Sequence, residues 1–378
     1  MMMKKMGAWM LLALLTLVGD WCGRCYGCLE EERIGLLEIK PLIDPNSIYM
    51  RDWVEYSSNC CEWYGIKCDN TTGRVIRLSL WDARDQSLGD WVLNASLFLP
   101  FKELQSLDLG YNGLVGCSEN QGFEVLSSKL RKLEVLDLSE NRFNDDKSIL
   151  SCFNGLSALK SLDLSDNQLT GSASMRLFPS SMLNFEKHHA GLKVLSSRLK
   201  KLENLDLSWN QCNDSIFSSI TGFSSLKSLV LSANQLTGSA SMRLFPSSML
   251  NFEKHHAGLK VLSSRLQKLE NLHLSRNQCN DSIFSSITGF SSLKSLDLSY
   301  NEVTGSASMR LFPSNMHNFE KHHAGLKVLS SKLKKLENLD LSDNQCNDSI
   351  FSSLSGFSSL KYLNLSQNQL TGSSTGIN

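Results

Sequence analysis

Hydrophobic and polar residues alternate in short stretches that recur along most of the chain. Residues 104–116 read LQSLDLGYNGLVG, in which leucines at fixed spacing lead to an asparagine and a further apolar residue. The same frame starts again at Leu133, Leu159, Leu202, Leu226, Leu269, Leu293, Leu336 and Leu360, and a weaker copy, VIRLSL, starts at Val75. Strict alternation predicts a short strand in every copy, with the leucines facing a core and the intervening residues facing outward.

The shared frame, L-x-x-L-x-L-x-x-N-x-L, is the leucine-rich-repeat signature. A single coil of this kind cannot bury both of its faces, so the coils have to stack with their strands paired in parallel. We therefore expect an α/β fold: a right-handed leucine-rich-repeat solenoid of about ten coils, with a curved parallel β-sheet on its concave face.

Two features of each coil have a defined structural task. The asparagine closes the turn after the strand, where its amide can pair with backbone groups that leave the sheet. Successive asparagines are therefore expected to form a ladder. After the turn, segments such as SIFSSITGFSSLK at 215–227 are expected to bury Ile216, Ile220, Phe223 and Leu226 on the convex side.

A longer period of 67 residues is superimposed on the coils, and each 67-residue unit holds two of them. The longer coil of each unit carries an insert of 19 residues. The inserts occupy 172–190, 239–257 and 306–324. Removing an insert restores the register of its coil, so the inserts are expected to bulge from the side or back of the solenoid. Solvated loops and translated intron sequence both remain open as explanations. Each insert contains Glu-Lys-His-His, but adjacent histidines rarely bind one ion together, and no metal site is expected.

The units differ mainly where the strands face outward. The first unit (163–229) and the second (230–296) differ at five positions, four of them outward. The four are Asp163/Val230, Asp166/Ala233, Asp206/His273 and Trp209/Arg276. The second and third units differ at thirteen positions, of which five face outward. We interpret the pattern as diversification of a binding surface; drift after recent duplication is the alternative, because exposed positions tolerate change.

The outward positions supply the candidate binding residues. Trp, Tyr and Arg are the residue types that anchor interfaces, and an outward Trp in a row of serines suggests a contact. The residues expected to bind a ligand on the concave face are Tyr111, Glu140, Asp166, Asp206, Trp209, His273, Arg276, Tyr300, Asp343 and Tyr362.

The N-terminus predicts a secretory route. Lys4 and Lys5 precede an apolar run that is too short to span a bilayer, which is typical of a signal peptide, expected at 1–27. An uncleaved anchor is the alternative. No later stretch is apolar enough to cross a membrane, so this chain is expected to lack a membrane anchor and to lie outside the cell or on the outer face of the plasma membrane. Glycosylation is expected in Asn-x-Ser/Thr motifs at Asn70, Asn94, Asn213, Asn280 and Asn347. Asn364 has the motif too but falls in a predicted strand and is expected to stay unmodified.

The cysteines fall into distinct groups. Cys28, Cys60, Cys61 and Cys68 form an N-terminal set, in which the adjacent Cys60 and Cys61 rarely join each other, so two pairings remain open. A second set replaces an inward leucine in alternate coils and is expected to consist of buried thiols. These are Cys212, Cys279 and Cys346. Cys117 and Cys152 lie in neighbouring coils and could pair.

The sequence CLEEERIGLLEIK, then W-x6-CC-x-W-x-G-I-x-C and TGRVIRLSL, resembles the N-terminal cap of plant extracellular leucine-rich-repeat proteins. The coil pattern LKSLDLSxNQLTG resembles the plant receptor-like proteins. The resemblance implies a cap at 28–73 with Cys28–Cys60 and Cys61–Cys68 disulfides, followed by the solenoid at 74–378. The acidic residues 30–32 are expected to open a short helix, with Pro41 and Pro45 limiting its length.

Composition narrows the possible functions. The chain has no net formal charge and a pI of about 7.1, which does not indicate nucleic acid or an anionic membrane as partner. We find no nucleophile motif, phosphate-binding loop or paired carboxylates, so no enzyme activity and no cofactor are expected. The resemblance implies receptor-like recognition of a protein, peptide or glycan in defence or development, with a co-receptor kinase as a further partner. A secreted inhibitor of microbial polygalacturonases and a non-functional duplicate are the alternatives. Family members continue with more coils and a membrane span, so we expect a truncated chain.

Overall fold

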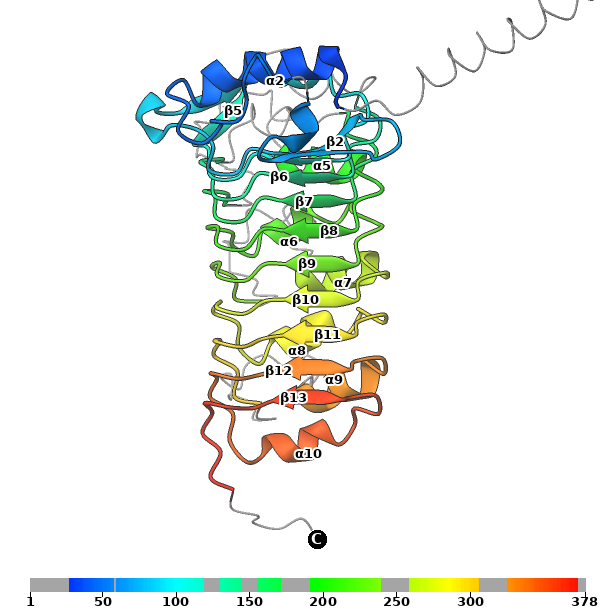
Figure 1. Cartoon of the computed structure of the whole chain (residues 1–378). Helices are drawn as coiled ribbons and strands as arrows, with labels where there is room; N and C mark the ends of the chain where they lie inside the picture. Colours follow the sequence, from blue (N-terminus) through cyan, green and yellow to red (C-terminus); the bar gives the residue numbers. More distant parts are fainter. Residues whose placement is uncertain are drawn as a thin grey trace, which may run out of the picture.

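The structure is a computed structural model that describes residues 27–57, 59–118, 130–144, 155–170, 191–238, 258–305 and 325–372. The expected signal peptide, except its last residue, and the three inserts lie outside these residues. The described part forms one stack of coils, with helix α2 (Glu30–Ile43) across one end and strand β13 (Tyr362–Asn364) near the other (Figure 1). The predicted leucine-rich-repeat solenoid with a disulfide-bonded cap is confirmed.

The main sheet has eleven strands in the described residues, and they follow one another in chain order. Besides β13, the strands of this sheet are β1 (Ile66–Cys68), β2 (Val75–Ser79), β4 (Ser106–Asp108), β6 (Val135–Asp137), β7 (Ser161–Asp163), β8 (Asn204–Asp206), β9 (Ser228–Val230), β10 (Asn271–His273), β11 (Ser295–Asp297) and β12 (Asn338–Asp340). β1 pairs with β2 antiparallel, and every later pair is parallel. A second, two-stranded sheet joins β3 (Trp91–Leu93) to β5 (Leu114–Cys117).

Short helices connect successive strands on the opposite side of the coils. They are α5 (Gly191–Arg198), α6 (Ile216–Ser219), α7 (Leu259–Arg265), α8 (Ile283–Ile287), α9 (Leu326–Lys332) and α10 (Ile350–Leu354), and 3-10 turns lie at η1 (Cys60–Glu62), η2 (Gln86–Leu88) and η3 (Ala95–Phe98). Ile216, Ile220, Phe223 and Leu226 are fully buried between the helical side and the sheet, as predicted. The core is therefore a continuous column of leucine, isoleucine and phenylalanine between the two sides.

The asparagine ladder is confirmed. The Asn210 Nδ2 donates to the carbonyl oxygens of Leu164 at 2.9 Å and Ser208 at 3.0 Å, while its Oδ1 accepts from the Leu169 amide at 2.9 Å. The asparagine thus ties its own coil to the preceding one. Equivalent bonds are made by Asn112, Asn141, Asn167, Asn234, Asn277, Asn301, Asn344 and Asn368.

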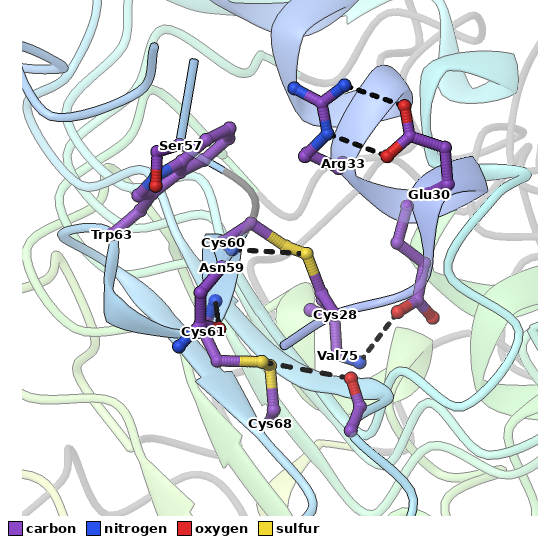
Figure 2. The surroundings of a disulfide bond; sticks show 12 residues. Cys28, Glu30, Arg33, Ser57, Asn59, Cys60, Cys61, Trp63, Cys68 and Val75 are labelled. Atoms are coloured by element: carbon purple, nitrogen blue, oxygen red, sulfur yellow. Dashed lines mark hydrogen bonds and ion pairs between the residues drawn. A yellow bond between two sulfur atoms is a disulfide. The ribbon is translucent and has the colours of Figure 1, made fainter. Parts of the chain in front are cut away.

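The cap is held by two disulfides. Cys28 bonds to Cys60 and Cys61 bonds to Cys68, the pairing that the family resemblance implies, and Figure 2 shows the two bonds side by side. Next to them the buried rings of Trp53 and Trp63 stack with centroids 5.7 Å apart. The first coil is thereby covered at the end where it has no preceding neighbour.

The end of helix α2 differs from the prediction. Pro41 lies inside the helix, so the expectation that it limits the helix is wrong. A proline lacks its own N–H donor, but here the helix continues past Pro41 as far as Ile43. The helix ends two residues before Pro45, as expected for that proline, because a residue directly before proline disfavours the helical conformation. That residue, Asp44, has a buried carboxylate that accepts the amides of Ile48, Tyr49 and Met50 at 2.8 Å each.

Glu32 has a role that its place in the first helical turn does not reveal. Its carboxylate is fully buried, accepts from the Arg74 Nε at 2.9 Å and from the Val75 amide at 3.0 Å, and so joins α2 to the start of β2 (Figure 2 shows the bond to Val75). A buried charge needs such partners, because an unpaired one would be strongly destabilising.

The remaining cysteines follow the prediction where they are described. Cys212, Cys279 and Cys346 are buried thiols, and burial raises the pKa of Cys346 to about 12. Cys117 is disulfide-bonded; Cys152, the partner considered from the sequence, lies outside the described residues.

Candidate ligand-binding face

One residue in each coil adopts a left-handed backbone with φ between 49° and 56°. It stands directly before the ladder asparagine or, in the first coil, before the alanine at the equivalent position. We call this set the turn row. It consists of Asp82, Tyr111, Glu140, Asp166, Trp209, Ala233, Arg276, Tyr300, Asp343 and Gln367. L-residues rarely adopt this conformation, and it persists only where the surroundings enforce it. Here the amide of every row residue before Gln367 donates to a carbonyl of the next coil, as from Trp209 to the Ser232 carbonyl at 2.9 Å.

Seven of the ten predicted binding residues lie in the turn row, and the other three lie in the strands. The prediction placed the seven at outward strand positions. That assignment is wrong, because each follows the end of its strand: β8 ends at Asp206, three residues before Trp209. The seven are Tyr111, Glu140, Asp166, Trp209, Arg276, Tyr300 and Asp343. The structure brings them together as neighbours in successive coils, interrupted only by Ala233.

Asp206 is the last residue of β8 and His273 is the last residue of β10. Both pair with Val230, the last residue of the intervening strand β9, so the three lie side by side in a second column. The Asp206 Oδ1 accepts from the Ser208 amide at 2.8 Å and from its hydroxyl at 2.6 Å, so this half-buried carboxylate has a local structural role. We call the column the strand column. It contains Ser79, Asp108, Asp137, Asp163, Asp206, Val230, His273, Asp297, Asp340 and Asn364.

The strand column shifts the pKa of its members in opposite directions. Burial is the main factor that raises the pKa of Asp163, and the neighbouring carboxylates of Asp206 and Asp137 add to it. Burial also acts to raise the pKa of Asp297, but bonds from His273 and Ser299 outweigh it, and the net shift is downward. The His273 Nδ1 lies 3.7 Å from the Asp297 Oδ2. The carboxylates are therefore more crowded near Asp163 than near Asp297.

Several aromatic side chains on this face are exposed. Trp209 is 59% exposed, and Tyr362, at the start of β13, is 55% exposed. The Arg276 guanidinium lies over the Tyr300 ring, 4.3 Å from its centroid. Stacking of this kind orients both groups while leaving the guanidinium edges accessible.

Trp81 belongs to the same face but was missed by the sequence prediction. Its ring stacks on Tyr111 with centroids 6.0 Å apart, and it is 48% exposed. It lies over Gly110, where an added Cβ would be 2.7 Å from the Trp81 Cδ1. The later coils have serine at this position, so the glycine was the available signal.

The remaining predicted modification sites are placed as follows. Asn70, Asn213, Asn280 and Asn347 are exposed, whereas Asn94 is partly buried and caps η3 through a bond from the Ser96 amide at 3.0 Å. Asn364 donates to the Asp340 Oδ2 at 3.0 Å. Glycosylation at these sites stays a prediction.

Two features were sought over the described part of the chain. No cluster of three or more His, Cys, Asp or Glu side chains there could hold a metal ion, and the Glu-Lys-His-His segments lie outside it. No helix in that part has both the length and the apolar character that a membrane span needs.

Family models match the cap and several of the coils. The model for the leucine rich repeat N-terminal domain matches residues 29–69. Models for the leucine rich repeat match 156–173 and 291–307, and also 132–156, 335–357 and 359–377.

The relatives are plant proteins. Cuscuta receptor 1 from Solanum lycopersicum is 37% identical over 240 residues, covering 57% of this chain and 21% of that protein. Receptor-like protein 9a from Arabidopsis thaliana is 37% identical over 209 residues, covering 54% of this chain and 19% of that protein. The chain thus spans about a fifth of the length of these curated relatives.

Solved structures share the fold. The ectodomain of the Arabidopsis receptor kinase HAESA, in complex with an IDA peptide hormone, matches with a TM-score of 0.56 at 24% identity over 90% of this chain and 46% of that chain. A plant ice-binding protein matches with a TM-score of 0.53 at 22% identity over 91% of this chain and 88% of that chain. The chain thus carries a leucine rich repeat N-terminal domain followed by leucine rich repeats, and it is similar to plant receptor-like proteins.

Proposed function

We propose that this chain is a non-enzymatic extracellular recognition module that binds a protein, peptide or glycan ligand on the outer face of its main sheet. Signalling in defence or development would then be left to a partner kinase. The relatives support this reading, since Cuscuta receptor 1 is a receptor by name. Secretion to the cell exterior, with the cap disulfides formed in an oxidising compartment, fits the same role.

The observation that carries the proposal is the contrast between a fixed backbone and variable side chains in the turn row. Trp209, Ala233, Arg276 and Asp343 occupy four row positions with φ values of 53° to 54°. Their amides all donate to serine carbonyls of the next coil at 2.8 to 3.0 Å. The scaffold therefore presents a different side chain at each step without any change in its own geometry, which is what a recognition surface requires.

Trp209 and Arg276 are the expected anchors. They belong to the residue types that dominate interface energetics, and both are exposed on the same row. Removing both side chains should cost at least tenfold in affinity, about 1.4 kcal/mol. Neither side chain contributes to the buried core, so stability should be preserved.

The test uses a random 12-residue peptide library displayed on phage and selected on the full chain. Selected peptides are then synthesised and titrated against Trp209→Ala/Arg276→Ala. The matched control is Lys193→Ala/Lys260→Ala, which removes two exposed side chains from α5 and α7 on the opposite side. We expect the first variant to bind at least tenfold more weakly and the control to bind within twofold.

Equal binding by Trp209→Ala/Arg276→Ala would refute the site. Inhibition of a purified polygalacturonase by the full chain, with no loss in this variant, would instead favour the inhibitor function considered from the sequence.

A further inference from the structure

Five glutamates on the same side of the coils each pair with a lysine of the following coil. The pairs are Glu103–Lys132, Glu134–Lys160, Glu203–Lys227, Glu270–Lys294 and Glu337–Lys361. Glu140 and Asp166 differ: among the described residues, neither carboxylate takes part in a salt bridge. Arg142, the cation closest to them in the sequence, is paired with Asp90. Within the described part of the chain, these two exposed carboxylates therefore have no cationic partner.

Their arrangement is fixed by the backbone. Glu140 and Asp166 are successive members of the turn row, and their amides donate to the carbonyls of Ser165 and Ser208 at 2.9 Å. Successive coils are about 4.8 Å apart, so the two carboxylates lie close enough to contact one cationic group. They line a shallow depression of about 200 Å³ together with Tyr111 and Arg142.

Aromatic rings flank the two carboxylates. Tyr111, stacked on Trp81, precedes Glu140 in the turn row, and Trp209 follows Asp166. All are substantially exposed, at 43% for Tyr111, 48% for Trp81 and 59% for Trp209. An aromatic face attracts a cation, and the attraction is larger when carboxylates lie beside it.

The strand column extends the negative potential of this region. It has aspartate at four successive positions beside these coils and then changes to Val230 and His273. The turn row changes at the same place, from Trp209 to Ala233 and Arg276. The crowding of carboxylates that helps raise the pKa of Asp163 is a local sign of this potential. A face with one sign of charge concentrates partners of the other sign.

We propose that the four coils from Tyr111 to Trp209 hold a lysine or arginine side chain of an extended basic peptide segment, with its cationic group on Glu140 and Asp166 and its stem between the aromatic rings. This inference rests on the proposed function and specifies its partner. Four coils span about 14 Å, which matches about four residues of extended chain.

The test uses a fluorescent octapeptide of alternating arginine and glycine, titrated against the full chain by anisotropy at about 0.1 M salt, where longer-range attraction is screened. A second octapeptide has citrulline, the neutral isostere, in place of arginine. The variant is Glu140→Gln/Asp166→Asn. The matched control, Glu270→Gln/Glu337→Gln, removes the same charge from two lysine-paired glutamates on the same side.

We expect citrulline and Glu140→Gln/Asp166→Asn each to weaken binding at least tenfold, and the control to stay within twofold. Equal loss in the control would mean bulk charge attraction, and equal binding of the citrulline peptide would exclude a cation subsite; either result overturns the inference. Unchanged binding by Glu140→Gln/Asp166→Asn would also overturn it. The phage-selected peptides separate this failure from that of the proposed function, because they can still depend on Trp209 and Arg276 without carrying basic residues.

Discussion

Trp209 and Asn210 are adjacent in the chain and have opposite tasks. The Asn210 side chain is 8% exposed and ties two coils together, while the Trp209 side chain is 59% exposed and only its backbone is bound. The next unit repeats the pair as Arg276 and Asn277. The coil therefore constrains the backbone of both residues but the side chain of only one, so one position can vary freely while its neighbour cannot.

The largest effect is expected from Asn210→Ala. The substitution leaves the Leu169 amide without a partner in the buried interior, which costs about 1 to 3 kcal/mol. It also removes one of the two bonds to the Leu164 carbonyl, which keeps its bond from the Asn167 Nδ2 at 3.1 Å, at a further cost of about 1 kcal/mol. We expect a loss of about 3 kcal/mol in the free energy of unfolding, measured with urea by circular dichroism. Trp209→Ala is the control and should stay within about 0.5 kcal/mol. Similar losses in both variants would remove the distinction between the ladder and the turn row.

Gly238→Ala separates backbone conformation from available space. Gly238 has φ of 63°, and an added Cβ would be 2.2 Å from the Ile283 Cδ1, whereas Gly372, with φ of 70°, has no atom within 4 Å of that position. We expect about 2 to 3 kcal/mol of destabilisation for Gly238→Ala and about 1 kcal/mol for Gly372→Ala. Equal losses would show that the left-handed φ, rather than crowding, is what excludes side chains there.

Asp163→Asn tests the strand column through pH. Because the folded-state pKa of Asp163 is raised above its ordinary value of 3.8, ionising it opposes folding. The contribution of Asp163 to the free energy of unfolding is therefore highest at a pH below 3.8, where the Asp163 carboxyl is protonated, and it falls as the pH rises through the raised pKa. We expect Asp163→Asn to unfold at higher urea than the native chain at pH 7, with the difference vanishing near pH 3. Asn364 already makes the same bond to its serine amide, at 3.1 Å, so the fold accepts asparagine in this column. A gain that persists at pH 3 would contradict the electrostatic cause.

The smallest effect is expected at Trp209 itself. Asparagine adopts left-handed φ more readily than alanine, so Trp209→Asn should be a few tenths of a kcal/mol more stable than Trp209→Ala. Paired urea midpoints measure the difference. A reversed order would mean that the ladder and the next coil do not impose the φ of 53° on this position.

The sequence predicted what depends on a repeated spacing. The ladder asparagines and the burial of Ile216 and Phe223 follow from period and polarity, and they were found where expected. The candidate binding residues were recognised as outward, but their left-handed backbone was not, because it arises from bonds to the next coil. Contacts made once in the chain were missed for a similar reason: the buried pair of Glu32 with Arg74 joins residues 42 apart.

Photo-crosslinking tests the central claim most directly. A phage-selected peptide carrying benzoylphenylalanine is bound to the full chain, irradiated, and its adducts are mapped by mass spectrometry. The turn row predicts adducts within residues 204–211 and 271–278, which contain Trp209 and Arg276. Adducts confined to the helices α5, α7 and α9 on the opposite side would contradict the account.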